Sequence, residues 1–327
     1  MCFPDYQWES LGHQVRATQS QAFAESTKSN ISTHVKAYCY FCIYFGIPVF
    51  PASHEALSRF VQVLQNSFKS PVSVYNYVSG LQSAHRVLGY EFPDIKSYEF
   101  TFQFKGGARI LQHLPSKAQP LTTQILTNIY KLLNMNDHFH VSFWAALLLG
   151  FLSFSRLASL LPKSAKSYSP TLHLSRQSIK VFSSHVQLNF SHSKTRQLGN
   201  HVHQVPLSAV PGSHLCPVMA VNNMLQLSPV SPQSPAFSYL LASAPCSLIQ
   251  HQFIDTLRLL LSWEGIPESK FSGHSLRRGG ASHAFNTGVR SELIKLHGDW
   301  RSSAYLGYLE MCPNTRLQVS RNMIHNP

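Results

Sequence analysis

The residues with the clearest chemical potential lie between Phe271 and Leu309, in the segment FSGHSLRRGGASHAFNTGVRSELIKLHGDWRSSAYLGYL. This segment contains His274 and Arg277 as a His-x-x-Arg pair, then Trp300, and then Tyr308. Transferring a phosphodiester to a protein group requires a nucleophile, cations that neutralise the transition state and a group that moves a proton. One short segment supplies all three, which indicates phosphoryl-transfer chemistry.

The His-x-x-Arg pair is predicted to begin a helix. Residues at i and i+3 share one helix face, and a helix N-terminus attracts phosphate. Gly279 and Gly280 follow, and they are expected to allow close approach of backbone or DNA. Arg278 is expected to point elsewhere, toward a DNA backbone or a carboxylate.

Two further cations are candidates for the same site. Arg156 lies in FLSFSRLASLLP, at the end of the most apolar predicted helix, where a charge is costly unless it meets a ligand or a partner. Few carboxylates lie nearby in the sequence, which favours phosphate over a carboxylate partner. Lys194 lies at the tip of a polar hairpin, SHSKTRQLGNH, with Arg196 as the alternative reactive cation.

The overall charge indicates a polyanionic partner. Lys and Arg number 27 against 14 for Asp and Glu, which gives a net charge of +13, and a chain this basic usually meets a polyphosphate. Acidic residues are too sparse to predict a magnesium site built from carboxylates. Of the six cysteines only Cys39 and Cys42 form a Cys-x-x-Cys, and no second pair stands at zinc spacing. We therefore expect no metal and no cofactor.

Apolar periodicity predicts the elements that must position these residues. It gives helices over 12–26, 31–46, 53–67, 71–89 and 97–112, and hence an all-α domain over residues 1–112. Glycines and prolines in 106–120 indicate a linker, placed at 113–120. Residues 121–327 form the second domain, with helices over 121–134, 141–161, 217–227 and 248–263 and short antiparallel strands over 178–182, 186–190 and 202–206. The expected fold class is mainly α with a small antiparallel β-sheet. No apolar run is long enough to span a membrane.

From about residue 120 to 310 the chain resembles the catalytic domain of the tyrosine recombinase, or phage-integrase-like, family. The helical part, with NISTHVKAYCYFC, resembles the core-binding domain that clamps DNA in that family. The phrases LCPVMAV and SGHSLRRGGASHAFNTGV are similar to the eukaryotic branch found in Crypton and DIRS-type mobile elements. The resemblance implies a site-specific recombinase or integrase that works on double-stranded DNA as a homo-tetramer on paired sites. It also implies a nuclear location for a eukaryotic member, or the nucleoid otherwise.

The resemblance also implies a role for each candidate residue. Tyr308 attacks a DNA phosphate to form a 3′-phosphotyrosyl bond, and His274 helps to move its proton. Arg156 and Arg277 hold the non-bridging oxygens. Lys194 protonates the leaving 5′ oxygen, and Trp300 donates a hydrogen bond beside the phosphate. Many relatives have Glu three residues after the first arginine, where this chain has Ser159.

Several alternatives stay open at this point. Tyr305 is the rival nucleophile, and His297 is the rival of Trp300. A domesticated DNA-binding protein without catalysis would share most of these features. A type IB topoisomerase shares the chemistry, although the short length and the helical N-terminal domain fit it less well. Under the recombinase interpretation, all six candidate residues should converge on one basic cleft.

Overall fold

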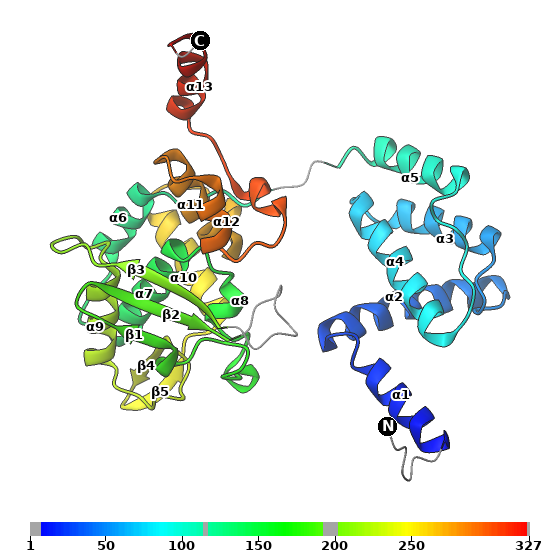
Figure 1. Cartoon of the computed structure of the whole chain (residues 1–327), viewed down its shortest axis with the longest axis horizontal. Helices are drawn as coiled ribbons and strands as arrows, with labels where there is room; N and C mark the ends of the chain where they lie inside the picture. Colours follow the sequence, from blue (N-terminus) through cyan, green and yellow to red (C-terminus); the bar gives the residue numbers. More distant parts are fainter. Residues whose placement is uncertain (1–7, 114–116, 192–201, 326–327) are drawn as a thin grey trace, which may run out of the picture. The chain divides into compact units, whose positions relative to one another are not determined.

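The computed structural model describes residues 8–113, 117–191 and 202–325. The chain divides into two compact units, Met1–Ser116 and Lys117–Pro327, here called the N-terminal and C-terminal units (Figure 1). At the start of the second unit the amides of Gln119 and Leu121 donate to the carbonyls of Lys270 and Ser275. Residues 117–121 are therefore anchored to the C-terminal unit.

Helices make up the described part of the N-terminal unit. They are α1 (Trp8–Ser20), α2 (Glu25–Phe45), α3 (His54–Ser67), α4 (Pro71–Leu88) and α5 (Tyr98–Leu111). The core shared by α2, α3, α4 and α5 contains Tyr38, Phe60, Leu81 and Phe100, all 2% exposed or less. The first helix break falls at residues 21–24 rather than at 27–30 as predicted. The polar residues Ser29 and Asn30 are exposed on the surface of a continuing helix, which is why they resembled a turn.

The C-terminal unit is built around α7 (His138–Leu152), whose residues from Val141 to Phe151 are all buried. Four-residue α8 (Leu157–Leu160) follows it, and α9 (Pro217–Leu227) and α11 (Gly273–Asn286) pack against it. The other helices are α6 (Thr123–Leu132), α10 (Gln250–Trp263), α12 (Ser291–His297) and α13 (Pro313–His325). Short 3-10 turns are η1 (Ala165–Ser167), η2 (Arg176–Ser178), η3 (Glu268–Lys270) and η4 (Ser303–Tyr308). None of the helices in the described ranges is both long and apolar enough to cross a membrane.

A small antiparallel sheet lies beside α9 (Figure 1). Its order is β1 (Ile179–Val181), β2 (His185–Phe190), β3 (His203–Ser208), and Phe190 pairs with His203. Alternate side chains of β2 are buried, as a sheet with one covered face requires. The predicted class, mainly α with a small antiparallel sheet, is confirmed. Lys194 and Arg196 lie in the β2–β3 connection, outside the described residues.

A second hairpin was not predicted. It pairs β4 (Ser238–Leu241) with β5 (Ala244–Ser247), and its turn residues Ala242 and Ser243 have φ of 47° and 66°. Tight hairpins with positive φ usually contain Asn-Gly or Asp-Gly. This turn contains neither, so the sequence carried no turn signal.

The predicted helix over 141–161 is wrong at its end, and this changes the position of Arg156. Helix α7 ends at Leu152, Phe154 has a φ of 51°, and Arg156 is the N-cap residue of α8. The side chain of Phe154 is buried in a cluster with Ala281, Ile294 and Trp300, which the reversal of the chain makes possible. Arg156 therefore lies in a tight turn between two helices, not at the end of one.

Two glycines set the approach of α11 to its neighbours. A Cβ at Gly279 would collide with the backbone of Leu121, and a Cβ at Gly280 would collide with the carbonyl of Phe151 and the ring of Phe154. All three neighbours belong to this chain, so the glycines allow α11 to approach other parts of the protein closely. Without that approach, α11 could not bring Arg277 to the turn at Phe154.

We predict that Gly280→Ala destabilises the C-terminal unit by about 1–3 kcal/mol, because backbone must move to accept the methyl group. Gly106→Ala in α5 is the matched control, since no atom lies within 4 Å of its added Cβ. Removing a glycine from a helix interior there should be neutral or stabilising. Urea unfolding of the full chain measures both. Equal stability of Gly280→Ala and wild type would contradict the packing described here.

Candidate active site

Arg277 is the centre of the candidate site. It is 2% exposed. Its guanidinium donates to the carbonyl of Phe154, and to that of Gly298 at 2.8 Å. Its Cζ lies 3.6 Å from the centre of the Trp300 ring, which is within the range of a cation–π contact. One side chain thus connects the α7–α8 turn, α11 and the loop after α12.

The same guanidinium retains hydrogen-bonding capacity. Arginine has five N–H donors. Two of them bind the carbonyls of Phe154 and Gly298, and Nε is buried without a partner among the described residues. A buried donor without a partner is costly. An anion that reached this donor would remove the cost.

The electrostatic surroundings of Arg277 also favour an anion. Its pKa is lowered to about 9, chiefly by burial and also by the neighbouring Arg156, while Tyr308 and Asp299 act in the opposite direction. Arg277 is therefore charged at neutral pH but lies beside a like charge. A bound phosphate would offset both the desolvation and the repulsion.

Tyr308 lies within this group of residues. Its ring is 5.5 Å from the Cζ of Arg277, 5.5 Å from the Trp300 ring and 6.1 Å from the His274 ring. The rival Tyr305 also contacts Trp300, with 6.2 Å between ring centres. Tyr308 is therefore the tyrosine placed next to the His-x-x-Arg pair. His274 itself is exposed at the start of α11, where the Ser272 hydroxyl accepts from its amide.

A small cavity of about 30 Å³ brings Arg156 and Arg277 together. Asp299 and Ser159 also line it. Asp299, which was not predicted as a site residue, is 8% exposed and has a φ of 53°. Its place directly before Trp300 was the available signal. His203, from β3, lines the cavity as well, and nothing in the sequence connected it to this region.

His297 has a structural position. Its Nε2 is 2.9 Å from the carbonyl of Leu152, so this nitrogen donates, and its own carbonyl accepts from Nε2 of His203 at 3.1 Å. These bonds join α12 to the end of α7 and to β3. Trp300, the alternative to His297, is the residue stacked on Arg277.

The structure thus brings together Arg156, His274, Arg277, Trp300 and Tyr308. Lys194 lies outside the described residues, so its position relative to them stays a prediction. No group of three or more His, Cys, Asp or Glu side chains that could hold a metal occurs among the residues described.

We predict that His297 makes stability fall in mild acid. Burial lowers its pKa below the usual 6.5, so the unfolded chain binds a proton first as the pH drops. Stability is then lost as pH falls through about 6.5 toward the lower folded pKa, and is retained above it. His297→Gln keeps an N–H donor but cannot titrate. Urea unfolding at a series of pH values should show a shallower pH dependence for the variant, and an unchanged slope would contradict the assignment.

Comparison with protein-family models and with curated proteins finds no match. Comparison with solved structures does. A lambda integrase dimer bound to a core site is similar with a TM-score of 0.56, 12% identity and coverage of 92% of this chain and 94% of that one. The Tn1549 transposon integrase in complex with transposon right end DNA gives a TM-score of 0.56 at 12% identity, with coverage of 94% of this chain and 98% of that one.

The XerH recombinase in a post-cleavage complex with a palindromic difH substrate gives a TM-score of 0.56 at 13% identity, with coverage of 88% of this chain and 76% of that one. These matches extend over both units of the chain. Its fold is therefore the fold of the tyrosine recombinases and integrases.

Proposed function

We propose that this protein breaks and rejoins double-stranded DNA as a tyrosine recombinase, with Tyr308 as the nucleophile. The observation that carries the proposal is the position of Tyr308 beside Arg277 and His274, with Arg156 on the same cavity as Arg277. The fold, which is shared with recombinases, supports this proposal. The role of each residue is argued from the geometry of the site.

Each residue has a defined part in the proposed reaction. The oxygen of Tyr308 bonds to a backbone phosphorus, the bond from phosphorus to the 5′ oxygen breaks, and the DNA 3′ end becomes a phosphotyrosyl ester. Arg277 and Arg156 neutralise the non-bridging oxygens of the transition state. His274 accepts the phenol proton. Lys194 supplies a proton to the leaving 5′ oxygen, and the 5′-hydroxyl of a second strand reverses the step.

Trp300 contributes by fixing Arg277. The indole is 7% exposed and covers the guanidinium, which excludes water from one face of the cation. A charge in such a water-excluded place acts more strongly on the transition state than one in solvent. This arrangement needs no metal to stabilise the phosphorane.

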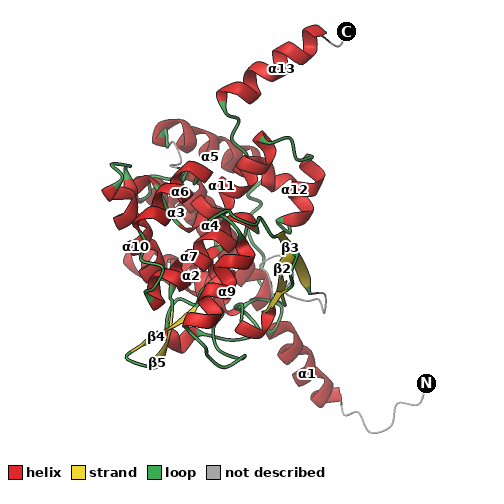
Figure 2. Ribbon diagram, turned by 90° about the vertical axis from the view of Figure 1, so that its left-hand side faces the viewer, coloured by secondary structure: helices red, strands yellow, loops and turns green. Residues whose placement is uncertain are grey.

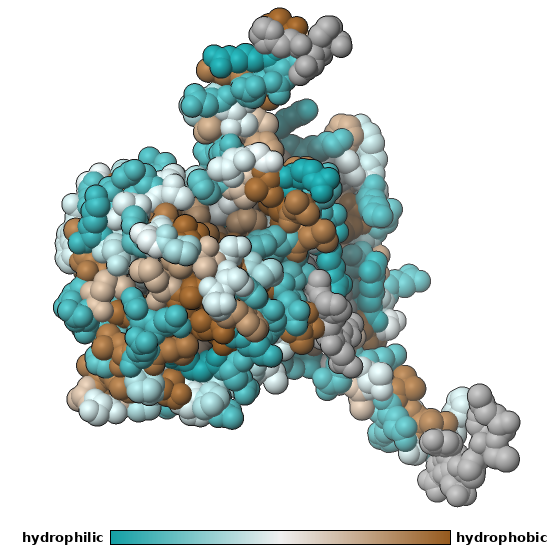
Figure 3. All heavy atoms as spheres, turned by 60° about the vertical axis from the view of Figure 1, so that its left-hand side comes forward, coloured by the Kyte–Doolittle hydropathy of each residue, from teal (hydrophilic) through white to brown (hydrophobic). Residues whose placement is uncertain are grey.

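Assembly on paired DNA sites as a homo-tetramer is part of the proposal. Two solved structures with this fold are a lambda integrase dimer on a core site and a lambda integrase tetramer on a Holliday junction. In this chain α13 extends away from the rest of the C-terminal unit (Figures 1 and 2). Its surface mixes hydrophilic and hydrophobic side chains (Figure 3), and Leu317, Met323 and Ile324 are more than half exposed. A neighbouring copy is a suitable partner for these side chains.

We also propose a eukaryotic mobile element as the source and the nucleus as the location.

The nucleophile can be tested directly. Tyr308→Phe removes one oxygen and keeps the ring, so folding and DNA binding should survive while covalent chemistry is lost. Wild type, incubated with a pool of nicked random-sequence duplexes and chelator, should give a protein–DNA adduct that resists denaturant. Tyr305→Phe is the matched control and should still form it.

Three outcomes would change the interpretation. An adduct lost only in Tyr305→Phe would exchange the two tyrosines. Binding without an adduct in any variant would favour a catalytically silent DNA-binding protein. Relaxation of supercoiled DNA by a monomer, without paired sites, would instead favour a type IB topoisomerase.

The net charge of +13 leads to a separate prediction for DNA affinity. Each neutralised phosphate releases counterions, so the logarithm of the affinity should fall linearly with the logarithm of salt concentration. Titration of a fluorescent duplex at several salt concentrations measures the slope. An affinity that stays constant between low and physiological salt would refute electrostatic binding.

A further inference from the structure

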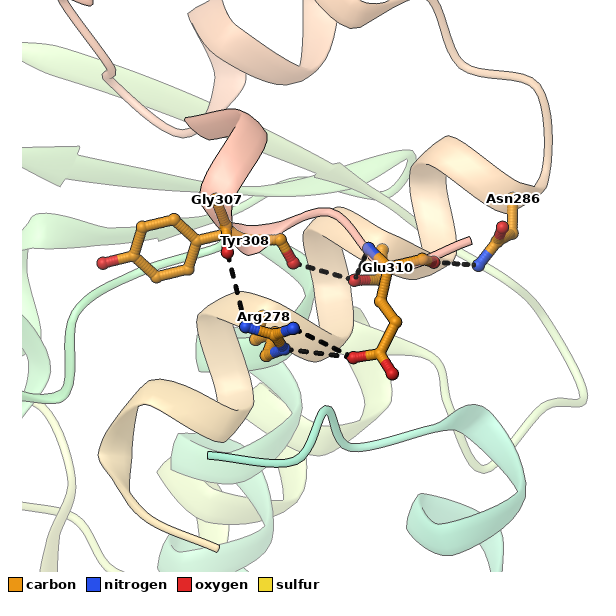
Figure 4. Close-up of polar contacts among 6 residues, drawn as sticks. Arg278, Asn286, Gly307, Tyr308 and Glu310 are labelled. Atoms are coloured by element: carbon orange, nitrogen blue, oxygen red, sulfur yellow. Dashed lines mark hydrogen bonds and ion pairs between the residues drawn. The ribbon is translucent and has the colours of Figure 1, made fainter. Parts of the chain in front are cut away.

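The backbone around Tyr308 is held by a row of polar side chains on the outer face of α11. The row consists of Arg278, Ser282 and Asn286, which are spaced by four residues and therefore share one helix face. Figure 4 shows these contacts, with the ring of Tyr308 directed away from Arg278. Arg277, one residue earlier, points into the site instead. The two adjacent arginines thus have different surroundings and different tasks.

The first two members of the row bind directly on either side of the nucleophile. Arg278 donates to the carbonyl of Gly307 at 3.3 Å and forms an ion pair with Glu310 at 3.0 Å. The hydroxyl of Ser282 donates to the carbonyl of Tyr308 at 3.0 Å and accepts from the amide of Glu310 at 3.0 Å. Ser282 is 5% exposed, so these bonds are protected from water.

The third member extends the row toward α13. Asn286 donates to the carbonyl of Glu310 at 2.9 Å, and its side-chain oxygen accepts from the amide of Cys312 and the hydroxyl of Thr315. Residues 307–312 therefore follow the α11 surface through a continuous set of hydrogen bonds. Those of Arg278 and Ser282 end at Glu310, whereas those of Asn286 continue into α13.

Local structure alone would leave Tyr308 weakly positioned. It is the last residue of η4, a 3-10 turn in which no residue is fully buried. Gly307, directly before it, has no atom within 4 Å of an added Cβ. A glycine in open space has wide backbone freedom. The row on α11 supplies the restraint that η4 lacks.

We propose that Arg278, Ser282 and Asn286 are positioning residues for Tyr308. By binding the backbone of residues 307–312 they hold its phenol beside Arg277 before DNA is bound. This inference rests on the proposed function, because it assigns the row to the same reaction. The row does not touch the phosphate. It acts through the geometry of the attacking oxygen, where a displacement of about 1 Å can cost on the order of 100-fold in rate.

The positioning can be tested without DNA by hydrogen–deuterium exchange on the full chain. Ser282→Ala removes the acceptor of the Glu310 amide, so exchange within residues 307–312 should accelerate about tenfold or more. Arg278→Gln should have a similar effect, while exchange in the core helix α7 should stay unchanged. Arg290→Gln, which alters an exposed arginine outside the row, is the matched control. Unchanged exchange of residues 307–312 in both row variants would overturn the proposal.

The functional consequence separates rate from binding. With the nicked duplex pool at saturating concentration, Ser282→Ala and Arg278→Gln should form the adduct on the order of 100-fold more slowly. Their Kd for duplex should stay within about twofold of wild type, as should that of Arg290→Gln. A loss that appears only in Kd, or no loss of rate, would overturn the assignment.

A charge exchange provides the most specific test. Arg278→Glu places two acids together and should slow adduct formation, and adding Glu310→Arg should restore most of the rate by reversing the ion pair. Failure of the double variant to recover would contradict a role through the Arg278–Glu310 pair. Absence of an adduct in wild type would refute the proposed function instead. Hydrogen–deuterium exchange would still decide whether the row holds residues 307–312.

Discussion

The buried guanidinium of Arg277 is the interaction on which the candidate site depends. Its bonds to the carbonyls of Phe154 and Gly298 fix two loops that lie far apart in the sequence. Those loops carry Arg156 and Trp300. Because burying a charge is costly, the fold must surround Arg277 with oriented carbonyls and an aromatic face. The same arrangement keeps the cation rigid, as transition-state stabilisation requires.

That burial depends in turn on the absence of side chains nearby. Gly279 and Gly280 let α11 touch the backbone at Leu121 and Phe151, and only this contact brings Arg277 to the turn that ends α7. The turn itself depends on the positive φ of Phe154. The packing of the core and the geometry of the site therefore both depend on α11. Its inner face supplies the cation, and its outer face holds the segment that carries the nucleophile.

The sequence predicted the helical core and the three-stranded sheet well. Apolar residues recur every 3.6 residues in a helix with one buried face and every 2 residues in a strand with one buried face. The sequence grouped His274, Arg277, Trp300 and Tyr308 because they lie in one short segment. It misplaced Arg156, since an apolar pattern continues through Phe154 although the backbone reverses there. It missed the β4–β5 hairpin, whose turn lacks glycine and asparagine. The contributions of Asp299 and His203 arise from tertiary contacts between distant segments, which no local pattern encodes.

The double task of Arg277 bears on how such a protein would decay if selection for catalysis ceased. In a chain retained only for DNA binding, this arginine would still join the loops at Phe154 and Gly298, so its loss would disturb the packing of the site. His274 is exposed, and the phenol oxygen of Tyr308 is not needed to fill the apolar cluster around Trp300. These two groups could be lost without harm to the fold. Across related chains, an intact Arg277 would therefore say little about activity, whereas His274 and Tyr308 would be its sensitive markers.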